Sequence, residues 1–370
     1  MSSVIIIQEH LPAFRVGFYE ALREELAKAE IRLALVVAPN QRNTFVRGEL
    51  DWAIPVPIKR FGPFAWQSVL RLSRKYDLIV VQQEIKYAAN PVLQLLAGLR
   101  KQRIAYWGHG RNFQAENPNS LPERCKNWLS IRVDWWFAYN RLSADSVREI
   151  GFPTDCITEV MNSIDTDQLR AVKNETGPEA LDQLKARLGI NSSNVAVYTG
   201  GLYRLKRLEF LMEAAVAIRK RIPDFHFLVI GSGPDESIVK NAAKRYPWIH
   251  PLGAKRDHEK VAYWMISKLH LMPGLVGLAV LDSLVLGVPL ITTADAAHSP
   301  EIDYLESGSN GLMLPAGTDP QAYANAVADL LENEIRLMAM AQQAVKDSEQ
   351  YSLARMAANF AEGIHAALRN

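Results

Sequence analysis

The chain has 370 residues, of which 48% are hydrophobic and 22% are charged, with a formal net charge of +2 at pH 7. This composition is that of an ordinary globular protein and excludes a disordered, collagen-like or disulfide-stabilised chain. The two cysteines lack the spacing of metal ligands. The sequence also lacks a basic stripe with interleaved aromatic residues, so we do not expect nucleic acid as a partner. The N-terminus lacks a signal-peptide pattern, so we expect a cytoplasmic protein.

The first half alternates short apolar strands with amphipathic helices. We predict strands at residues 4–7, 33–37, 78–82, 104–107 and 135–138, with helices such as 16–29 and 91–101 between them. This alternation is typical of a doubly wound parallel α/β sheet. We therefore assign residues 1–168 to a first Rossmann-like domain on the acceptor side.

The second half repeats this plan. Strands are predicted at residues 195–198, 225–230, 269–272 and 290–292, with a short one near His250. Residues 169–193 are polar and contain Gly and Pro, which indicates a linker, so the second Rossmann-like domain spans 194–350. Two such domains bind ligands at the carboxyl ends of their strands, in the cleft that they face.

Residues 271–293, LMPGLVGLAVLDSLVLGVPLITT, read as a strand, a glycine turn, a buried helix and a second strand. Gly274 and Gly277 allow a ligand to approach the amides at the helix start, near Leu278 and Ala279, where anions bind. Asp282, one turn along, could accept hydrogen bonds from the hydroxyls of a sugar or ribose. Its charge also excludes a membrane span. The same spacing also suits a buried core helix in which Asp282 is only a cap.

This segment resembles the signature of glycosyltransferase family 4, or group 1, of the GT-B fold: Pro-Ser-x-x-Glu-Gly-Phe-Gly, four residues, Glu-Ala, then Gly-x-Pro. Gly274 takes the place of the first glutamate, Gly277 that of the glycine and Asp282 that of the second glutamate. The first glutamate contacts the transferred sugar in the family, so its loss puts the identity of the sugar in doubt. The resemblance also implies that a last helix, in residues 351–370, crosses back onto the first domain.

A second motif, TGGLYRLKRL at residues 199–208, follows a predicted strand and opens a helix. The family usually has Gly-Arg-Leu, three residues and Lys here. Gly201 replaces the arginine, Lys206 retains the lysine, and Arg204 is near enough to substitute. Glycines let the backbone approach a diphosphate, and a lysine can pair with it. The alternative is a helix start with solvated cations.

Other loops at strand ends match the family less closely. Gly233, in the Gly-Ser-Gly-Pro loop at 231–234, and Lys255 take positions beside the nucleotide in the family. His109, between two glycines, resembles the histidine beside the transferred sugar, although a structural hydrogen bond is the alternative. Arg15 lies where the first loop of the family meets the diphosphate or the acceptor. The alternative is that Arg15 is an exposed arginine at the start of a helix.

Two motifs concern recognition more than chemistry. His298-Ser299-Pro300-Glu301 and Ser309-Asn310-Gly311 match the Pro-Glu turn and the Asn-Gly of the family. Asp165-Thr166-Asp167 mimics an Asp-x-Asp metal motif, but it follows a sequence that resembles the exit of the first domain. We therefore expect no metal and no other cofactor.

The resemblance implies a glycosyltransferase, of the hexosyl- or deoxyhexosyltransferase class, that moves a sugar from a nucleotide-diphosphate donor to a hydroxyl. The reaction would retain anomeric configuration without a metal, in bacterial-type surface polysaccharide synthesis, with a glycan or lipid-linked glycan as acceptor. His109 and Lys206 would be catalytic. One alternative is a nucleotide-sugar epimerase on the same fold, which needs acid and base carboxylates. Another is a non-catalytic sugar-nucleotide-binding subunit, given the lost glutamate and arginine.

A peripheral contact with the inner face of a membrane is a further hypothesis. Aromatic anchors combined with cations favour an anionic lipid surface. The alternative is that the aromatic residues lie in the core and the charges are solvated. The residues concerned are Phe61, Phe64 and Trp66 with Lys59, Arg60, Arg71, Arg74 and Lys75.

Overall fold

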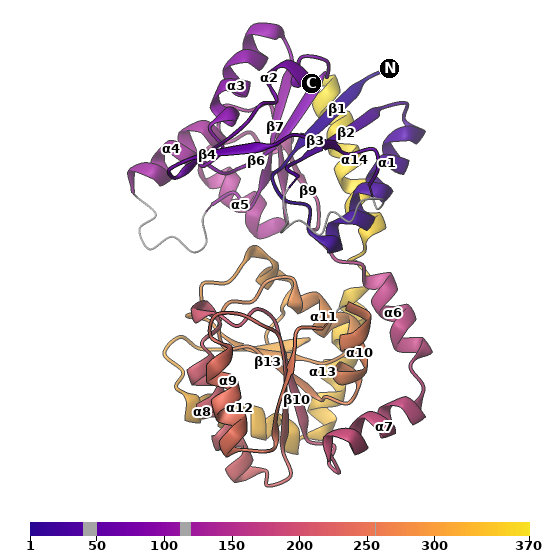
Figure 1. The fold of residues 1–370 in the computed structure, drawn as a ribbon, viewed down its shortest axis with the longest axis vertical. Coiled ribbons are helices and arrows are strands. Elements are labelled where there is room, and N and C mark those ends of the chain that lie inside the picture. Colours follow the sequence, from indigo (N-terminus) through magenta and orange to yellow (C-terminus); the bar gives the residue numbers. More distant parts are fainter. Residues whose placement is uncertain (40–49, 112–119, 256) are drawn as a thin grey trace. The chain divides into compact units, whose positions relative to one another are not determined.

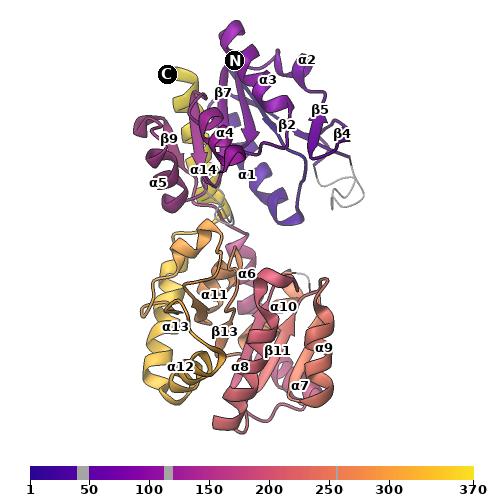
Figure 2. The same cartoon turned by 90° about the vertical axis from the view of Figure 1, so that its left-hand side faces the viewer.

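The computed structural model describes residues 1–39, 50–111, 120–255 and 257–370. It divides into two compact units, one of Met1–Ile164 with Ser352–Asn370 and one of Asp165–Tyr351. Each unit is built around its own parallel sheet flanked by helices (Figures 1 and 2). The predicted α/β class with two doubly wound domains is therefore confirmed.

The sheet of the first unit has seven strands, and every neighbouring pair is parallel. The predicted strands all form, within a residue or two of the expected bounds. Two short edge strands, at 54–55 and 157–159, lacked a sequence signal. The order across the sheet is β3 (Ile54–Pro55), β2 (Arg32–Val37), β1 (Ser3–Ile7), β6 (Leu78–Gln82), β7 (Arg103–Gly108), β8 (Trp135–Ala138) and β9 (Ile157–Glu159).

Helices bury both faces of this sheet, so successive strand residues enter different cores. Val4 and Ile6 of β1 pack with the first core, and Ile5 and Ile7 pack with the second. Helices α1 and α14 supply much of the first core, and α3 supplies much of the second. The helices are α1 (Val16–Lys28), α2 (Leu70–Ser73), α3 (Ala89–Arg100), α4 (Leu121–Ser130), α5 (Arg141–Glu149) and α14 (Leu353–Arg369).

The last helix, α14, belongs to the first unit although it ends the chain. Phe360 stacks on Phe137 of β8 with ring centroids 4.1 Å apart, and it also packs edge-on against Phe18 of α1. Gly363 permits the close approach, because a Cβ there would lie 2.7 Å from the Phe137 ring. The chain therefore crosses between the two units twice.

The second unit has a six-stranded parallel sheet. Its strands run in the order β12 (Ile249–Gly253), β11 (His226–Ile230), β10 (Val195–Thr199), β13 (Leu269–Leu271), β14 (Leu290–Thr293) and β15 (Gly311–Leu314). Its helices are α6 (Thr166–Glu175), α7 (Pro178–Leu188), α8 (Leu208–Arg221), α9 (Glu236–Arg245), α10 (Asp257–Met265), α11 (Ala279–Leu286), α12 (Pro320–Glu332) and α13 (Glu334–Ser348).

The stretch predicted as a linker, residues 169–193, differs from the expectation. Most of it forms α6 and α7, which belong to the second unit and bury Leu169 and Leu184. Gly177 and Gly189 account for the interrupted helical pattern of the sequence. Gly177 precedes the start of α7, and Gly189 caps its end in the left-handed conformation at φ 66°. The boundary between the units lies earlier, at Ile164 and Asp165.

The residues proposed as one membrane surface lie in different places. Strands β4 (Ile58–Phe61) and β5 (Phe64–Gln67) form an antiparallel hairpin whose tip exposes 63% of Phe61 and 49% of Phe64. Arg60 binds Glu9, which follows the carboxyl end of β1. Arg74 and Lys75 instead precede the amino end of β6. No described helix is long and apolar enough to cross a membrane.

Candidate functional site

Backbone hydrogen bonds join three loops at the carboxyl ends of strands in the second unit. In the loop after β10, the Leu202 amide donates to the Ser232 carbonyl, 2.9 Å away in the loop after β11. The Leu275 amide, in the loop after β13, donates to the Leu205 carbonyl at 2.8 Å. The three loops, which carry most of the predicted donor residues, therefore form one connected surface.

Lys206 is buried at the centre of this surface, with 6% of its area exposed. Its Nζ donates to the Leu275 carbonyl oxygen at 2.5 Å and lies 3.7 Å from the sulfur of Met272. Burial lowers the pKa of Lys206 to about 8, so the ammonium remains mostly protonated at neutral pH. A positive charge is thus held beside the loop that leads into α11.

The start of α11 is the part of this segment that reaches the surface. The run from Leu271 to Val276 is buried, whereas Gly277, Leu278 and Ala279 are partly exposed. Leu278 is the N-cap residue, as predicted, and no side chain caps the helix. The Val280 and Leu281 amides already donate to the carbonyl oxygens of Gly277 and Leu278, at 3.2 and 3.0 Å. An anion at this helix start would therefore meet the partly exposed turn up to Ala279.

Gly274 and Gly277 have different surroundings. A Cβ at Gly274 would lie 2.6 Å from the Cα of Lys206 and closer still to the Leu205 carbonyl oxygen. A Cβ at Gly277 would come no nearer than 3.6 Å, to the Ser299 hydroxyl. The position that holds the first signature glutamate in the family thus has no room for a side chain in this conformation.

Asp282 is buried and forms an ion pair that the sequence did not predict. Its carboxylate lies 2.9 and 3.0 Å from the Nζ of Lys260 on α10. This pair ties α11 to α10 inside the unit, and breaking a buried pair leaves an uncompensated charge. The interpretation of Asp282 as a core residue thus gains support, and its contact with a ribose stays a prediction.

His298 fixes the approach to α11. Its Nδ1 accepts from the Val276 amide at 3.1 Å, and its Nε2 donates to the Thr293 carbonyl oxygen at 2.8 Å. Both ring nitrogens are used by the backbone, so the imidazole is held neutral, and burial lowers its pKa further. The histidine of the Pro-Glu motif therefore shapes the helix start.

The other predicted donor residues surround the same loops. Gly201 stands where the family has arginine, and a Cβ there would lie 2.7 Å from the Tyr203 ring. Gly233 is packed against the backbone of Leu202, and Arg204 is exposed. Lys255, after β12, has its Nζ 6.0 Å from the Tyr263 ring centroid.

His109 and Arg15 lie in the first unit and share one neighbour, Tyr139. The His109 ring meets the Tyr139 ring edge-on at 4.5 Å, and burial, with help from Lys126, lowers the pKa of His109 to about 4. His109 is therefore neutral at physiological pH and can act as a hydrogen-bonding group rather than as a cation.

Arg15 is buried, which contradicts the alternative of an exposed arginine at a helix start. Its guanidinium donates to Asn162 and to the sulfur of Met356 on α14, and it lies 5.5 Å from the Trp107 ring centroid. Arg15 thus holds the first loop against the last helix. A contact with the donor or acceptor stays a prediction.

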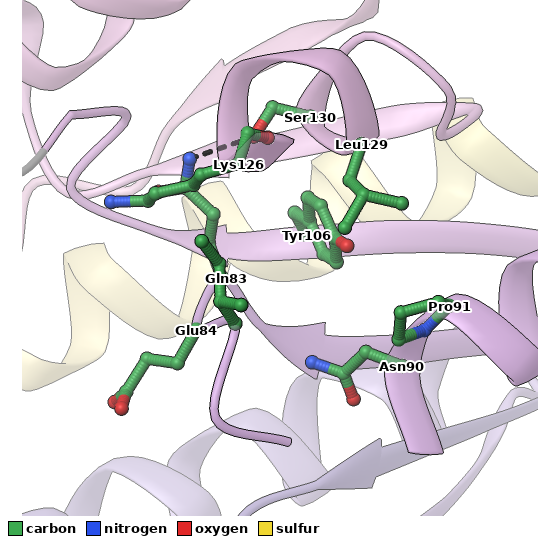
Figure 3. A pocket seen from close by; sticks show the side chains of 9 residues that line it. Gln83, Glu84, Asn90, Pro91, Tyr106, Lys126, Leu129 and Ser130 are labelled. Atoms are coloured by element: carbon green, nitrogen blue, oxygen red, sulfur yellow. Dashed lines mark hydrogen bonds between the residues drawn. The ribbon is translucent and has the colours of Figure 1, made fainter. Parts of the chain in front are cut away.

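Polar residues that sequence reasoning did not assign also gather at the carboxyl ends of β1 and β6. Glu9 is buried, binds Arg60 and accepts from the Tyr87 hydroxyl at 3.1 Å. Figure 3 shows a cavity lined by Gln83 and Lys126, with a volume of about 10 Å³, which is room for one water at most. The polar Gln8-Glu9-His10 run after a strand was the available sequence signal.

The Asp-x-Asp sequence serves as a helix start. Asp165 accepts from the Gln168 amide at 2.9 Å as the N-cap of α6, and Asp167 pairs with Arg170 at 2.8 Å. Among the described residues, no group of three or more His, Cys, Asp or Glu is placed to hold a metal ion.

Residues 193–333 match the model of the family described as Glycosyl transferases group 1. EpsD of Bacillus subtilis, which is named as a glycosyltransferase, is 23% identical over 96% of this chain and 93% of its own length. The D-inositol 3-phosphate glycosyltransferase of Corynebacterium urealyticum is 28% identical over 47% of this chain, which spans only 43% of that protein. These matches confirm the resemblance and indicate a glycosyltransferase enzyme.

HepE of Anabaena, solved in complex with UDP, superposes with a TM-score of 0.76 at 16% identity, covering 99% of this chain and 100% of HepE. The UDP-GlcNAc 2-epimerase of Neisseria meningitidis gives a lower TM-score of 0.64 at 15% identity, with both chains fully covered. The fold is therefore GT-B, and the epimerase is the weaker match.

Proposed function

We propose that this protein transfers a sugar from a nucleotide-diphosphate donor to a hydroxyl of a glycan or lipid-linked glycan, with retention and without a metal. The observation that carries the proposal is the partly exposed start of α11 after a loop whose Leu275 carbonyl oxygen binds the buried ammonium of Lys206. Both features stabilise negative charge, and the diphosphate gains charge as the bond to the sugar breaks. Retention and metal independence rest on the resemblance to the family.

The first unit supplies the groups that meet the sugar and the acceptor. His109, neutral because its pKa is about 4, hydrogen-bonds the transferred sugar. The exposed Phe61 and Phe64 of the β4–β5 hairpin, with Lys59 beside them, contact a membrane that carries the acceptor. Replacing both Phe with Ser should then abolish sedimentation with anionic vesicles, and unchanged sedimentation would remove this part of the proposal.

The second candidate is a subunit that binds the nucleotide sugar without turning it over. One observation favours it: the tight backbone at Gly274 excludes the carboxylate that contacts the sugar in the family. The two candidates share the donor site and differ in turnover, so turnover decides between them.

Calorimetry with UDP, the nucleotide bound by HepE, tests the donor site. Removal of a charge-assisted contact to phosphate costs about 1.5 to 3 kcal/mol, so Lys206→Met should weaken UDP binding roughly 10- to 100-fold. Lys220→Met, at the other end of α8 and exposed, is the matched control and should bind as the wild type does. If Lys206→Met binds UDP, GDP and ADP as tightly as the control, Lys206 is not part of the site.

A further inference from the structure

A cavity of about 360 Å³ lies in the first unit, away from the carboxyl-end loops described above. It is lined by the turn after α2, the turn after α3 and Leu368 near the end of α14. Arg103, also in its wall, is the first residue of β7, so the cavity lies at the amino ends of the strands. Figures 1 and 2 show both termini at this end, near α2 and α3. The volume falls in the range of about 300 to 1,000 Å³ that is usual for ligand pockets.

The lining of this cavity carries an excess of positive charge. The one carboxylate in the wall, Asp77, already accepts from the backbone amide and the hydroxyl of Ser3, both at 2.8 Å. A carboxylate outside the wall, that of Asp134, has its Oδ1 3.4 Å from the Nη1 of Arg103. The five cations of the wall are Arg74, Lys75, Arg100, Lys101 and Arg103.

The two cationic turns are joined to each other. The side-chain Nε2 of Gln102 donates to the carbonyl oxygens of Ser73 at 2.9 Å and of Tyr76 at 2.6 Å. The Arg103 amide donates to the Asp77 carbonyl oxygen at 2.9 Å. These bonds fix the backbone of both turns relative to each other, so the residues that carry the cations lie in one wall without a ligand.

Two further features of this wall are energetically unfavourable. The Nη1 of Arg100 is buried and has no hydrogen-bond partner among the described residues, although guanidinium donors in native proteins are nearly always paired. Lys101 takes a left-handed conformation at φ 55°, which glycine would adopt without strain. A cation thus occupies a position where glycine is the favourable residue.

Helix capping explains only part of this arrangement. Cations in the last turn complement the dipole of a helix, which accounts for Arg100 and Lys101 at the end of α3. It does not account for Arg74 and Lys75, since α2 has four residues and little dipole.

We propose that this cavity is an anion site that binds the phosphate group of a ligand, separately from the nucleotide-sugar site of the second unit. Arginine forks match the geometry of phosphate oxygens, and the lysines add charge. The phosphate belongs either to a free phosphorylated compound or to a lipid headgroup.

Binding to the full-length protein distinguishes the two sources. Calorimetry with inorganic phosphate and with pyrophosphate reports a free ligand. Sedimentation with phosphatidylcholine vesicles that do or do not contain phosphatidic acid reports a headgroup, and it is done with Phe61 and Phe64 both replaced by Ser so that the hairpin does not contribute. Arg74→Gln should weaken whichever interaction is found by about tenfold. Arg71→Gln, also exposed but outside the cavity wall, is the matched control in calorimetry and should leave phosphate binding unchanged. For the vesicles the control is Arg187→Gln, exposed on α7 of the second unit.

Lys101→Gly separates binding from folding. It relieves the left-handed strain, so its Tm should equal or exceed that of the wild type, while phosphate binding should fall by about tenfold. UDP binding should stay unchanged in both cavity variants, so that failure of this site is distinct from failure of the donor site. The proposal is overturned if neither phosphate source binds, or if Arg74→Gln and Lys101→Gly bind as tightly as the control of the same assay.

Discussion

Gly274→Ala is the sharpest structural perturbation of the donor surface. The added methyl would overlap the backbone of Leu205 and Lys206, with 2.6 Å to the nearest Cα. Overpacking of this kind costs about 1 to 3 kcal/mol. In a domain the size of the second unit, this lowers Tm by roughly 2 to 12 °C. Because the shift also displaces Lys206, UDP binding should weaken together with stability.

Thermal unfolding followed by circular dichroism, with UDP titration below the transition, measures both effects. Gly277→Ala is the control, because a methyl there makes only ordinary contact with the Ser299 hydroxyl at 3.6 Å. Its Tm should stay at or above that of the wild type, because Gly277 does not have a positive φ and alanine lowers the conformational entropy of the unfolded chain. Gly277→Ala is a control for stability alone, so UDP binding is compared with the wild type. If Gly274→Ala unfolds at the temperature of Gly277→Ala and binds UDP as tightly as the wild type, the loop has room for a side chain at Gly274.

Three other predictions follow from the same site. Asp282→Ala should lower the free energy of unfolding by about 3 to 5 kcal/mol in chemical denaturation, since Lys260 loses its buried partner. The double replacement Asp282→Leu with Lys260→Met should recover much of this loss. Affinity for UDP, measured by calorimetry, should fall as pH rises through about 8, because Lys206, whose pKa burial lowers to about 8, then loses its proton; Lys206→Met should lack this dependence. Donor turnover should survive EDTA, whereas loss restored by magnesium would contradict a metal-free reaction.

The parallel sheets were predictable because their strands are continuous apolar runs between helical patterns. Residues 78–82 and 135–138 form β6 and β8 as expected. The β4–β5 hairpin was not predicted, since Pro57, Gly62 and Pro63 interrupt the local pattern. It also contacts residues of other loops, through Arg60 with Glu9 and Ala65 with Tyr87. Strand β9 is three residues long, too short to show a period.

The local structure of the proposed donor surface was predictable where it depends on the backbone. The glycine turn and the start of α11 follow from local sequence, and so does the position of Lys206 after a strand. The partner of Asp282 was not predictable, because Lys260 lies on another helix, and its pairing depends on how α10 packs beside α11. The cationic cavity was not predictable for the same reason, because its two turns lie about 25 residues apart in the sequence.

Donor turnover is the most direct test of the central claim, that this chain is a nucleotide-sugar glycosyltransferase whose leaving group is stabilised by Lys206 and the α11 start. The protein is incubated with UDP-, GDP- and ADP-sugars without an acceptor, and release of the nucleoside diphosphate is followed by chromatography. We expect slow hydrolysis of one donor class, much reduced in Lys206→Met and unchanged in Lys220→Met. Tight binding of a nucleotide sugar with no release, with or without glycan and lipid acceptors, would contradict the claim and leave the non-catalytic subunit as the function.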